Sequence, residues 1–155
     1  MAKSRIRKFR ESFLYAGRGL RLCITGERNF RVHMTAAFYV TAAAVMGHVT
    51  STEAAVLCLC FGLTMGAELM NTAVERLCDK TARGYDRMVR DAKDIAAAVF
   101  VCAAACVAVG VCIFLMHGVL AAALRFLAAR LWLAMVFLVT VPAAVWFVFF
   151  FGRKQ

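Results

Sequence analysis

Several polar side chains share one face of an apolar run that is long enough to cross a membrane. An arc of about 80°, at about 100° per residue, holds Glu68, Asn71, Glu75 and Asp79, with Thr64 one turn further in. Carboxylates inside a membrane span are costly and normally face a protein interior or a water-filled cavity. Glu68 stands about 10 Å from the end of the run at 1.5 Å per residue, a depth that suits work on a lipid head group. The alternative is that these residues only join helices by hydrogen bonds.

Three further polar residues flank the predicted membrane segments. Lys93 and Asp94 are predicted to open the third span, at a helix N-terminus that attracts anions such as phosphate. The alternative is that Asp94 caps this helix and Lys93 extends to the interface. Glu27 stands among arginines, where a surface ion pair is the simpler interpretation. If Glu27 lies near Glu75, the two carboxylates provide the oxygen ligands that Mg²⁺ prefers.

Other chemistry that these residue types perform elsewhere has no signature in this chain. There is no GxxxxGK[ST] or GxGxxG phosphate loop. His33, His48 and His117 are too scattered for a metal site, and we interpret them as interface residues. The seven cysteines form no CxxC pair and lie mostly in apolar runs, which favours packing over disulfides or zinc.

The composition requires a lipid environment. Hydrophobic residues make up 63% of the 155-residue chain, against about 45–50% in soluble domains. The net charge of +10 at first suggests nucleic acid, but the basic residues lie between apolar runs and not on one polar face. We therefore expect no nucleic-acid partner. The first residues are too charged for a signal peptide.

The apolar runs predict an all-α integral membrane protein with four membrane helices. Three core spans at about 30–47, 54–76 and 93–116 follow an interfacial amphipathic helix at about 9–26, and a fourth span lies at about 131–151. Each of the last three spans matches the roughly 20 residues that cross hydrocarbon. The alternative for residues 9–26 is a basic anchor that only fixes the topology. We divide the chain into a membrane domain, 1–116, and a C-terminal extension, 117–155.

The basic residues predict the orientation. Residues 1–31 hold nine Lys or Arg, the 48–53 segment holds none and the 76–93 segment holds six. Because basic loops remain on the cytoplasmic side, we expect the N-terminus and the 76–93 segment in the cytoplasm.

Several motifs together resemble one family. The string ELMNTAVE, followed by AKD about 17 residues after Glu75, resembles the prokaryotic diacylglycerol kinase and undecaprenol kinase family, as do YAGRGLR and ERNFRVH. The resemblance covers about residues 9–116. It implies a homotrimer in the bacterial inner membrane, with active sites shared between subunits. It also implies transfer of the γ-phosphate of ATP to the hydroxyl of a membrane lipid.

The resemblance also implies roles for individual residues. Glu68 would be the general base, and Glu27 and Glu75 would hold Mg²⁺ at the ATP phosphates. Lys93 would neutralise phosphate charge, while Asn71 and Asp94 would position the nucleotide or the reacting groups. Tyr15 and Asp79 would lie near the nucleotide.

Two departures from the family pattern bear on the substrate and on the extension. His33 stands where the proteobacterial diacylglycerol kinases carry an acidic residue, which favours the Gram-positive branch and undecaprenol over diacylglycerol. The basic family lacks the tail after His117, so we expect a chain truncated after Met116 to remain active.

A transporter is the competing function from another class. Small proton-coupled transporters of similar size use an intramembrane Glu, usually a single one near the midplane. Here the stripe continues to the cytoplasmic end, which favours phosphate chemistry.

Overall fold

The computed structural model describes residues 2–81, 84 and 86–152, with side chains from residue 7 onward. The end of the predicted extension, 153–155, lies outside this part. The described residues form helices and no strand. The helices are α1 (Ala2–Gly26), α2 (Arg28–Met46), α3 (Ser51–Thr81), α4 (Arg87–Ala97), α5 (Val99–Met116), α6 (Val119–Ala128) and α7 (Leu131–Phe150).

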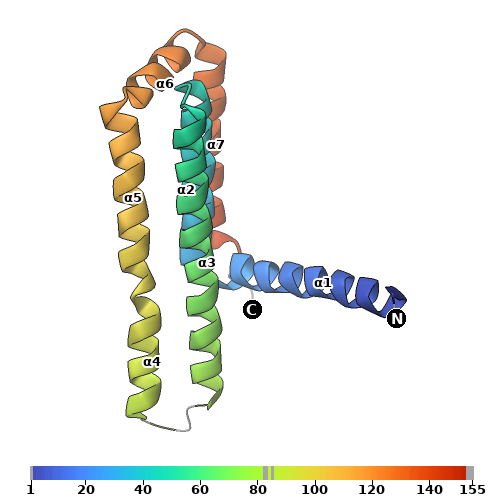
Figure 1. Cartoon of the computed structure of the whole chain (residues 1–155). Helices are drawn as coiled ribbons and strands as arrows, with labels where there is room; N and C mark the ends of the chain where they lie inside the picture. The colour runs from blue at the N-terminus through green and yellow to red at the C-terminus, as the bar shows by residue number, and fades with distance from the viewer. Residues whose placement is uncertain (1, 82–83, 85, 153–155) are drawn as a thin grey trace.

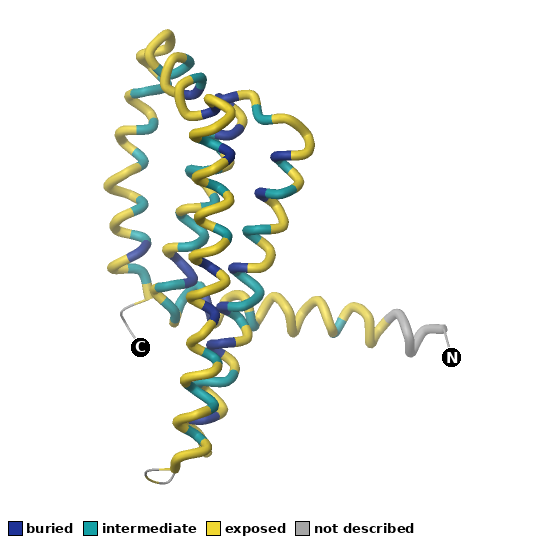
Figure 2. The backbone as a smooth tube through the Cα atoms, turned by 60° about the vertical axis from the view of Figure 1, so that its left-hand side comes forward, coloured by how far each residue is buried: buried dark blue, intermediate teal, exposed yellow. Residues whose placement is uncertain are grey.

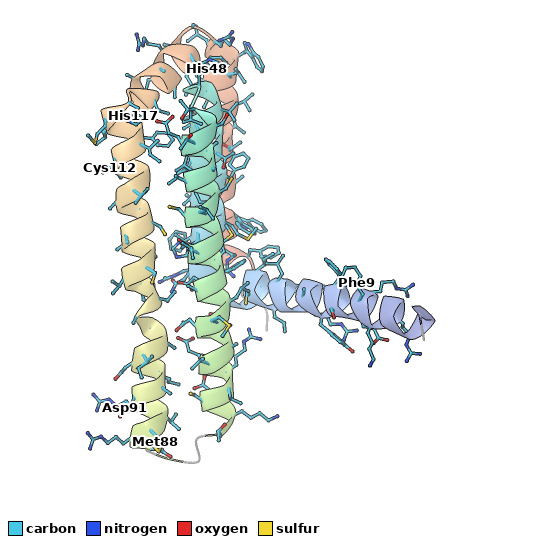
Figure 3. All side chains as sticks on the ribbon, in the orientation of Figure 1. Phe9, His48, Met88, Asp91, Cys112 and His117 are labelled. Carbon is cyan, nitrogen blue, oxygen red and sulfur yellow. The ribbon has the colours of Figure 1, made fainter. Side chains whose placement is uncertain are left out.

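The long helices stand side by side, and α1 projects away from them. Figure 1 shows α2, α3, α5 and α7 along one axis, with the short α6 across the end far from α1. The last part of α3 and all of α4 extend past the level of α1 at the other end. On α1 the side chain of Phe9 (Figure 3) is exposed, as are those of Phe13 and Leu14, as expected of a helix that lies in the membrane interface.

The predicted all-α membrane fold is confirmed. Among the described residues, three stretches are long and apolar enough to cross a membrane: Ser51–Thr81, Arg87–Met116 and Leu131–Phe150. The helix α2 is not among them, although its 19 residues rise about 28 Å at 1.5 Å per residue. α3 is longer than the predicted span and runs on to Thr81.

The third span begins earlier than predicted. Asp86 caps α4, because its side chain accepts hydrogen bonds from the backbone N–H of Met88 (2.8 Å) and Val89 (3.4 Å). Lys93 and Asp94 therefore lie within α4 and not at a helix N-terminus. The predicted anion site at free backbone N–H groups, and capping by Asp94, are both wrong. The charged segment around Asp86 has no hydropathy signal, so an apolar run could not locate this helix start.

The helix α3 is polar inside and apolar outside. Figure 2 shows short buried segments separated by exposed ones along the helices. The buried residues of α3 include Thr64, Glu68, Asn71 and Thr72. Its exposed side carries Leu59, Leu63, Met70 and Leu77. An apolar outer face is stable only against lipid or another apolar surface. The part of the polar stripe that includes Glu68 and Asn71 thus faces the protein interior, as the cost of intramembrane carboxylates requires.

A capping box begins α3 at the end of the bundle far from α1. The Glu53 side chain accepts from the Thr50 backbone N–H (2.7 Å), while Thr50 Oγ1 accepts from the Glu53 N–H (3.3 Å). Glu53 also contacts His117, which lies where α5 ends (Figure 3). His117 is therefore more than an interface residue, because it joins the ends of two helices.

We expect Thr50→Ala to lower the free energy of unfolding by about 1 kcal/mol, because an N-cap hydrogen bond is lost. Unfolding of detergent-solubilised protein by added SDS, followed by circular dichroism, measures this change. Ser51→Ala is the control, since Ser51 is exposed and its hydroxyl has no hydrogen-bond partner among the described residues. Equal stability of the two variants would contradict the capping role.

Candidate active site

Glu68 lies opposite a histidine on the neighbouring helix. Glu68 on α3 is only 2% exposed. Its Oε1 is 3.5 Å from Nε2 of His33 on α2, within ion-pair distance when the ring is protonated. Sequence reasoning missed this neighbour, because nothing in the chain indicates the register in which α2 packs on α3.

Two oxygens of the polar stripe are buried without a hydrogen-bond partner. They are Glu68 Oε1 and Asn71 Oδ1, and no other buried side-chain N or O atom in the described part lacks a partner. The amide of Asn71 donates through Nδ2 to Glu75 Oε1 at 2.9 Å, so its carbonyl is turned away from Glu75. Buried oxygens are normally paired. Two unpaired acceptors one turn apart are suited to a proton or a cation from a ligand.

Glu27 lies at the junction of α1 and α2 and contacts α3. Its Oε1 is 3.5 Å from Nη2 of Arg76. Gly26 makes room for this pair, because a Cβ there would come within 2.8 Å of the same Arg76 nitrogen. Glu27 thus forms an ion pair, as the simpler interpretation expects, but its partner is Arg76 on α3 and not one of the arginines near it in the sequence. On α3, Glu68 is eight residues from Arg76, the residue at this junction, which corresponds to about 12 Å at 1.5 Å per residue.

The acidic residues suit a magnesium ion shared with phosphate. Glu75 lies seven residues, or about two turns, from Glu68 on the same face of α3, and Asn71 between them donates to Glu75. No group of three His, Cys, Asp or Glu side chains in the described residues forms a metal cage. Mg²⁺ does not need one, since it binds through one or two carboxylates plus substrate phosphates and water. The oxygen donors of Glu27, Glu75 and Asn71 fit that requirement.

Beyond the junction, α3 and α4 are joined by an ion pair. Lys93 donates to Asp79 Oδ1, and both side chains are substantially exposed. Lys93 thus remains beside the acidic stripe, although not at a helix N-terminus. Asp94 pairs with Arg90 at 3.7 Å on the exposed surface of α4.

Tyr15 lies apart from the other candidates. It is exposed on α1, and its ring contact within the described residues is with Arg18, whose Cζ is 5.8 Å from the ring centroid. Cys23, near the end of the same helix, is buried beside Thr72, and burial raises the pKa of its thiol. This thiol therefore remains protonated at neutral pH, as expected of a packing residue.

An apolar cavity of about 340 Å³ lies between α2, α3 and α5. His33 and Thr64 line it together with Tyr39, Leu57, Cys106 and Phe114. From His33 it continues along α2 to Ala43, away from the α1 level, over about 15 Å at 1.5 Å per residue. The residue that faces Glu68 therefore also borders a space suited to a hydrocarbon chain.

Comparisons with known proteins cover most of this arrangement. The sequence profile of prokaryotic diacylglycerol kinases matches residues 14–114. A diacylglycerol kinase of Synechocystis sp. is 41% identical over 106 residues, which make up 67% of this chain and 61% of that protein. An undecaprenol kinase of Bacillus subtilis is 33% identical over 114 residues, which make up 73% of this chain and 93% of that protein. No solved structure matches significantly.

The chain thus spans less than two thirds of the Synechocystis protein. The matched residues include the second half of α1, all of α2, α3 and α4, and nearly all of α5, and they leave out α6 and α7. The names of the family and of both relatives are those of lipid kinases. With its acidic stripe inside the matched helices, the chain belongs to the prokaryotic diacylglycerol kinase family.

Proposed function

We propose that this protein phosphorylates the hydroxyl group of a membrane lipid, with ATP as donor, Mg²⁺ as cofactor and Glu68 as general base. The observation that carries the proposal is the buried Glu68, whose Oε1 has no hydrogen-bond partner and lies 3.5 Å from Nε2 of His33, a residue that lines the apolar cavity. A lipid whose chain occupies the cavity would bring its hydroxyl to this oxygen.

The proposed reaction is a direct transfer. Glu68 Oε1 accepts the hydroxyl proton, the lipid oxygen bonds to the γ-phosphorus, and the bond to the β–γ bridging oxygen breaks to release ADP. Such a transfer depends mainly on positioning and on neutralising charge. Mg²⁺ held by Glu27 and Glu75 would neutralise phosphate oxygens. Asn71 holds Glu75 in place, and Lys93 adds positive charge beside the stripe.

We propose that the nucleotide binds at the end of the molecule where α3 and α4 extend past the level of α1. Tyr15, Asp79 and Asp94 lie on the three helices that border this region, α1, α3 and α4, and we propose that they contact or orient ATP. The protruding end of α3 and α4 (Figure 1) suits a water-soluble substrate. We propose that the protein lies in a bacterial inner membrane, with this end of α3 and α4 and the N-terminus on the cytoplasmic side.

We propose undecaprenol as the preferred acceptor and diacylglycerol as the second. His33 beside Glu68 supports this choice. One of the two relatives is named a diacylglycerol kinase and the other an undecaprenol kinase, so both acceptors are candidates. We further propose a homotrimer, as the resemblance implies, with the exposed apolar face of α3 available for contact with another subunit. The proton-coupled transporter has less support, since Glu68 lies only about 12 Å from the junction of α1 and α2 and not at the midplane. The neighbouring Glu75 and Lys93 are also residues suited to Mg²⁺ and phosphate. Residues 1–116 form the proposed kinase unit, and 117–155 extend it.

Purified protein in mixed micelles with Mg-ATP, offered undecaprenol and diacylglycerol side by side, tests the proposal. We expect phosphate on the lipid hydroxyl, with undecaprenol preferred. Phosphorylation of neither lipid, with ATP left intact, would remove the kinase function. A preference for diacylglycerol would overturn only the assignment of the acceptor.

A further inference from the structure

A buried arginine joins the ends of three helices. Arg31, in the second turn of α2, is 5% exposed. Its Nε donates to the carbonyl oxygen of Val148 in the last turn of α7 (3.1 Å). Its Nη1 donates to the carbonyl oxygens of Ile24 (2.9 Å) and Thr25 (3.3 Å), at the end of α1. The last carbonyls of a helix have no partner within it and carry partial negative charge. One guanidinium therefore donates hydrogen bonds to the C-terminal carbonyls of both α1 and α7.

Further contacts bring the end of α7 against the same place. Gly152 has φ +79°, and a Cβ there would collide with the carbonyl oxygen of Thr25. The guanidinium of Arg28 lies 6.0 Å from the ring centroid of Phe149. Figure 1 shows the C-terminal end of α7 returning to the junction of α1 and α2. The close approach does not rest on Arg31 alone.

The clamped junction carries Glu27. Ile24 and Thr25 precede Glu27 in the chain and Arg31 follows it, while the Arg31 backbone N–H donates to the Glu27 carbonyl at 3.3 Å. Any change in the angle between α1 and α2 moves the Glu27 carboxylate relative to α3. The α7 carbonyl in this clamp comes from outside the family match, which ends at residue 114.

We infer that Arg31 is a positioning residue, and that α7 serves the kinase site by holding the α1–α2 junction, and with it Glu27, in place. This inference rests on the proposed role of Glu27 in binding Mg²⁺. It revises the expectation that the chain truncated after Met116 remains active, because truncation removes the Val148 carbonyl, one of three acceptors, and uncovers the guanidinium.

Two substitutions in the full chain break the clamp from opposite sides. Arg31→Lys provides a single ammonium group, which does not reproduce the planar fork of donors. Gly152→Ala strains the end of α7 and touches none of the proposed site residues. For both we expect backbone amides in residues 22–32 to exchange with deuterium faster, by about tenfold or more. Arg31→Lys loses charge-assisted hydrogen bonds, and the Cβ of Gly152→Ala pushes the end of α7 away from Thr25. The Mg²⁺ concentration for half-maximal rate should rise severalfold, while the KM for the lipid stays unchanged.

Thr140→Val is the matched control on α7. It removes the bond that the Tyr39 hydroxyl donates to Thr140 Oγ1 (3.0 Å) and leaves the clamp intact, so exchange in 22–32 and the Mg²⁺ dependence should not change. Unchanged exchange in the Arg31 and Gly152 variants would overturn the inference. Faster exchange with unchanged Mg²⁺ dependence would overturn the positioning role. If the unaltered protein phosphorylates neither lipid, the proposed function fails, and the exchange data still decide whether α7 holds the junction.

Discussion

Glu68→Gln abolishes lipid phosphorylation and leaves the protein folded: this is the expected result for the residue at the centre of the stripe. The carboxamide keeps the shape of the buried side chain but does not accept the hydroxyl proton. A general base contributes about 10²–10⁴-fold to a rate, so turnover should fall at least that far. Because Glu68 is buried, a neutral replacement also removes the cost of a charge in a site of low polarity. Stability should therefore be equal or higher. Initial rates in mixed micelles measure the first effect, and SDS unfolding measures the second.

The control for this variant is the other buried glutamate of the same helix. Glu53 lies at the far end of α3, in the capping box with Thr50. Glu53→Gln should lower stability and retain turnover, the reverse of the pattern for Glu68→Gln. Normal turnover in Glu68→Gln would remove Glu68 from the role of base. Loss of turnover in both variants would indicate a general effect of charge in α3.

Features that depend on the local chain could be predicted from the sequence. The apolar runs gave the helical membrane fold, because a span needs a fixed length of apolar residues whatever surrounds it. The stripe from Glu68 to Asp79 follows from helical periodicity alone. Its inward orientation follows from the cost of intramembrane carboxylates, and the burial of Glu68 and Asn71 agrees with it.

Features that depend on packing between distant segments could not be predicted. The distance between His33 and Glu68 is set by the register of α2 against α3. In the sequence, Arg31 is one of several basic residues before a span. In the structure it is buried and donates to Val148 of α7, which is 117 positions further along the chain. The start of α4 was missed for a different reason, because a single N-cap in a charged segment is a weak signal beside a long apolar run.

The second large effect is expected at Glu75. In Glu75→Gln the amide oxygen can still accept the hydrogen bond that Asn71 Nδ2 now donates at 2.9 Å, so the local structure should be kept. The negative charge is lost, however, and a neutral amide oxygen is a weaker ligand for Mg²⁺ than a carboxylate. We expect the Mg²⁺ concentration for half-maximal rate to rise by at least about tenfold, because mutation of even the outer-shell partners of a metal's ligands typically costs that much. Rates measured across a Mg²⁺ titration at saturating lipid give this value.

Asp91→Asn provides the matched control, since Asp91 (Figure 3) is an exposed acid on α4. Its partner is Arg87, at 4.0 Å. The variant's Mg²⁺ dependence should equal that of the unaltered protein. A second readout, Mn²⁺ binding in the presence of a non-hydrolysable ATP analogue, separates loss of the metal from loss of catalysis. Glu75→Gln should weaken this binding and Glu68→Gln should not, because of these two residues only Glu75 is proposed as a ligand. Equal Mn²⁺ affinity in the two variants would contradict that division of roles, and the stripe would then act as a single anionic surface.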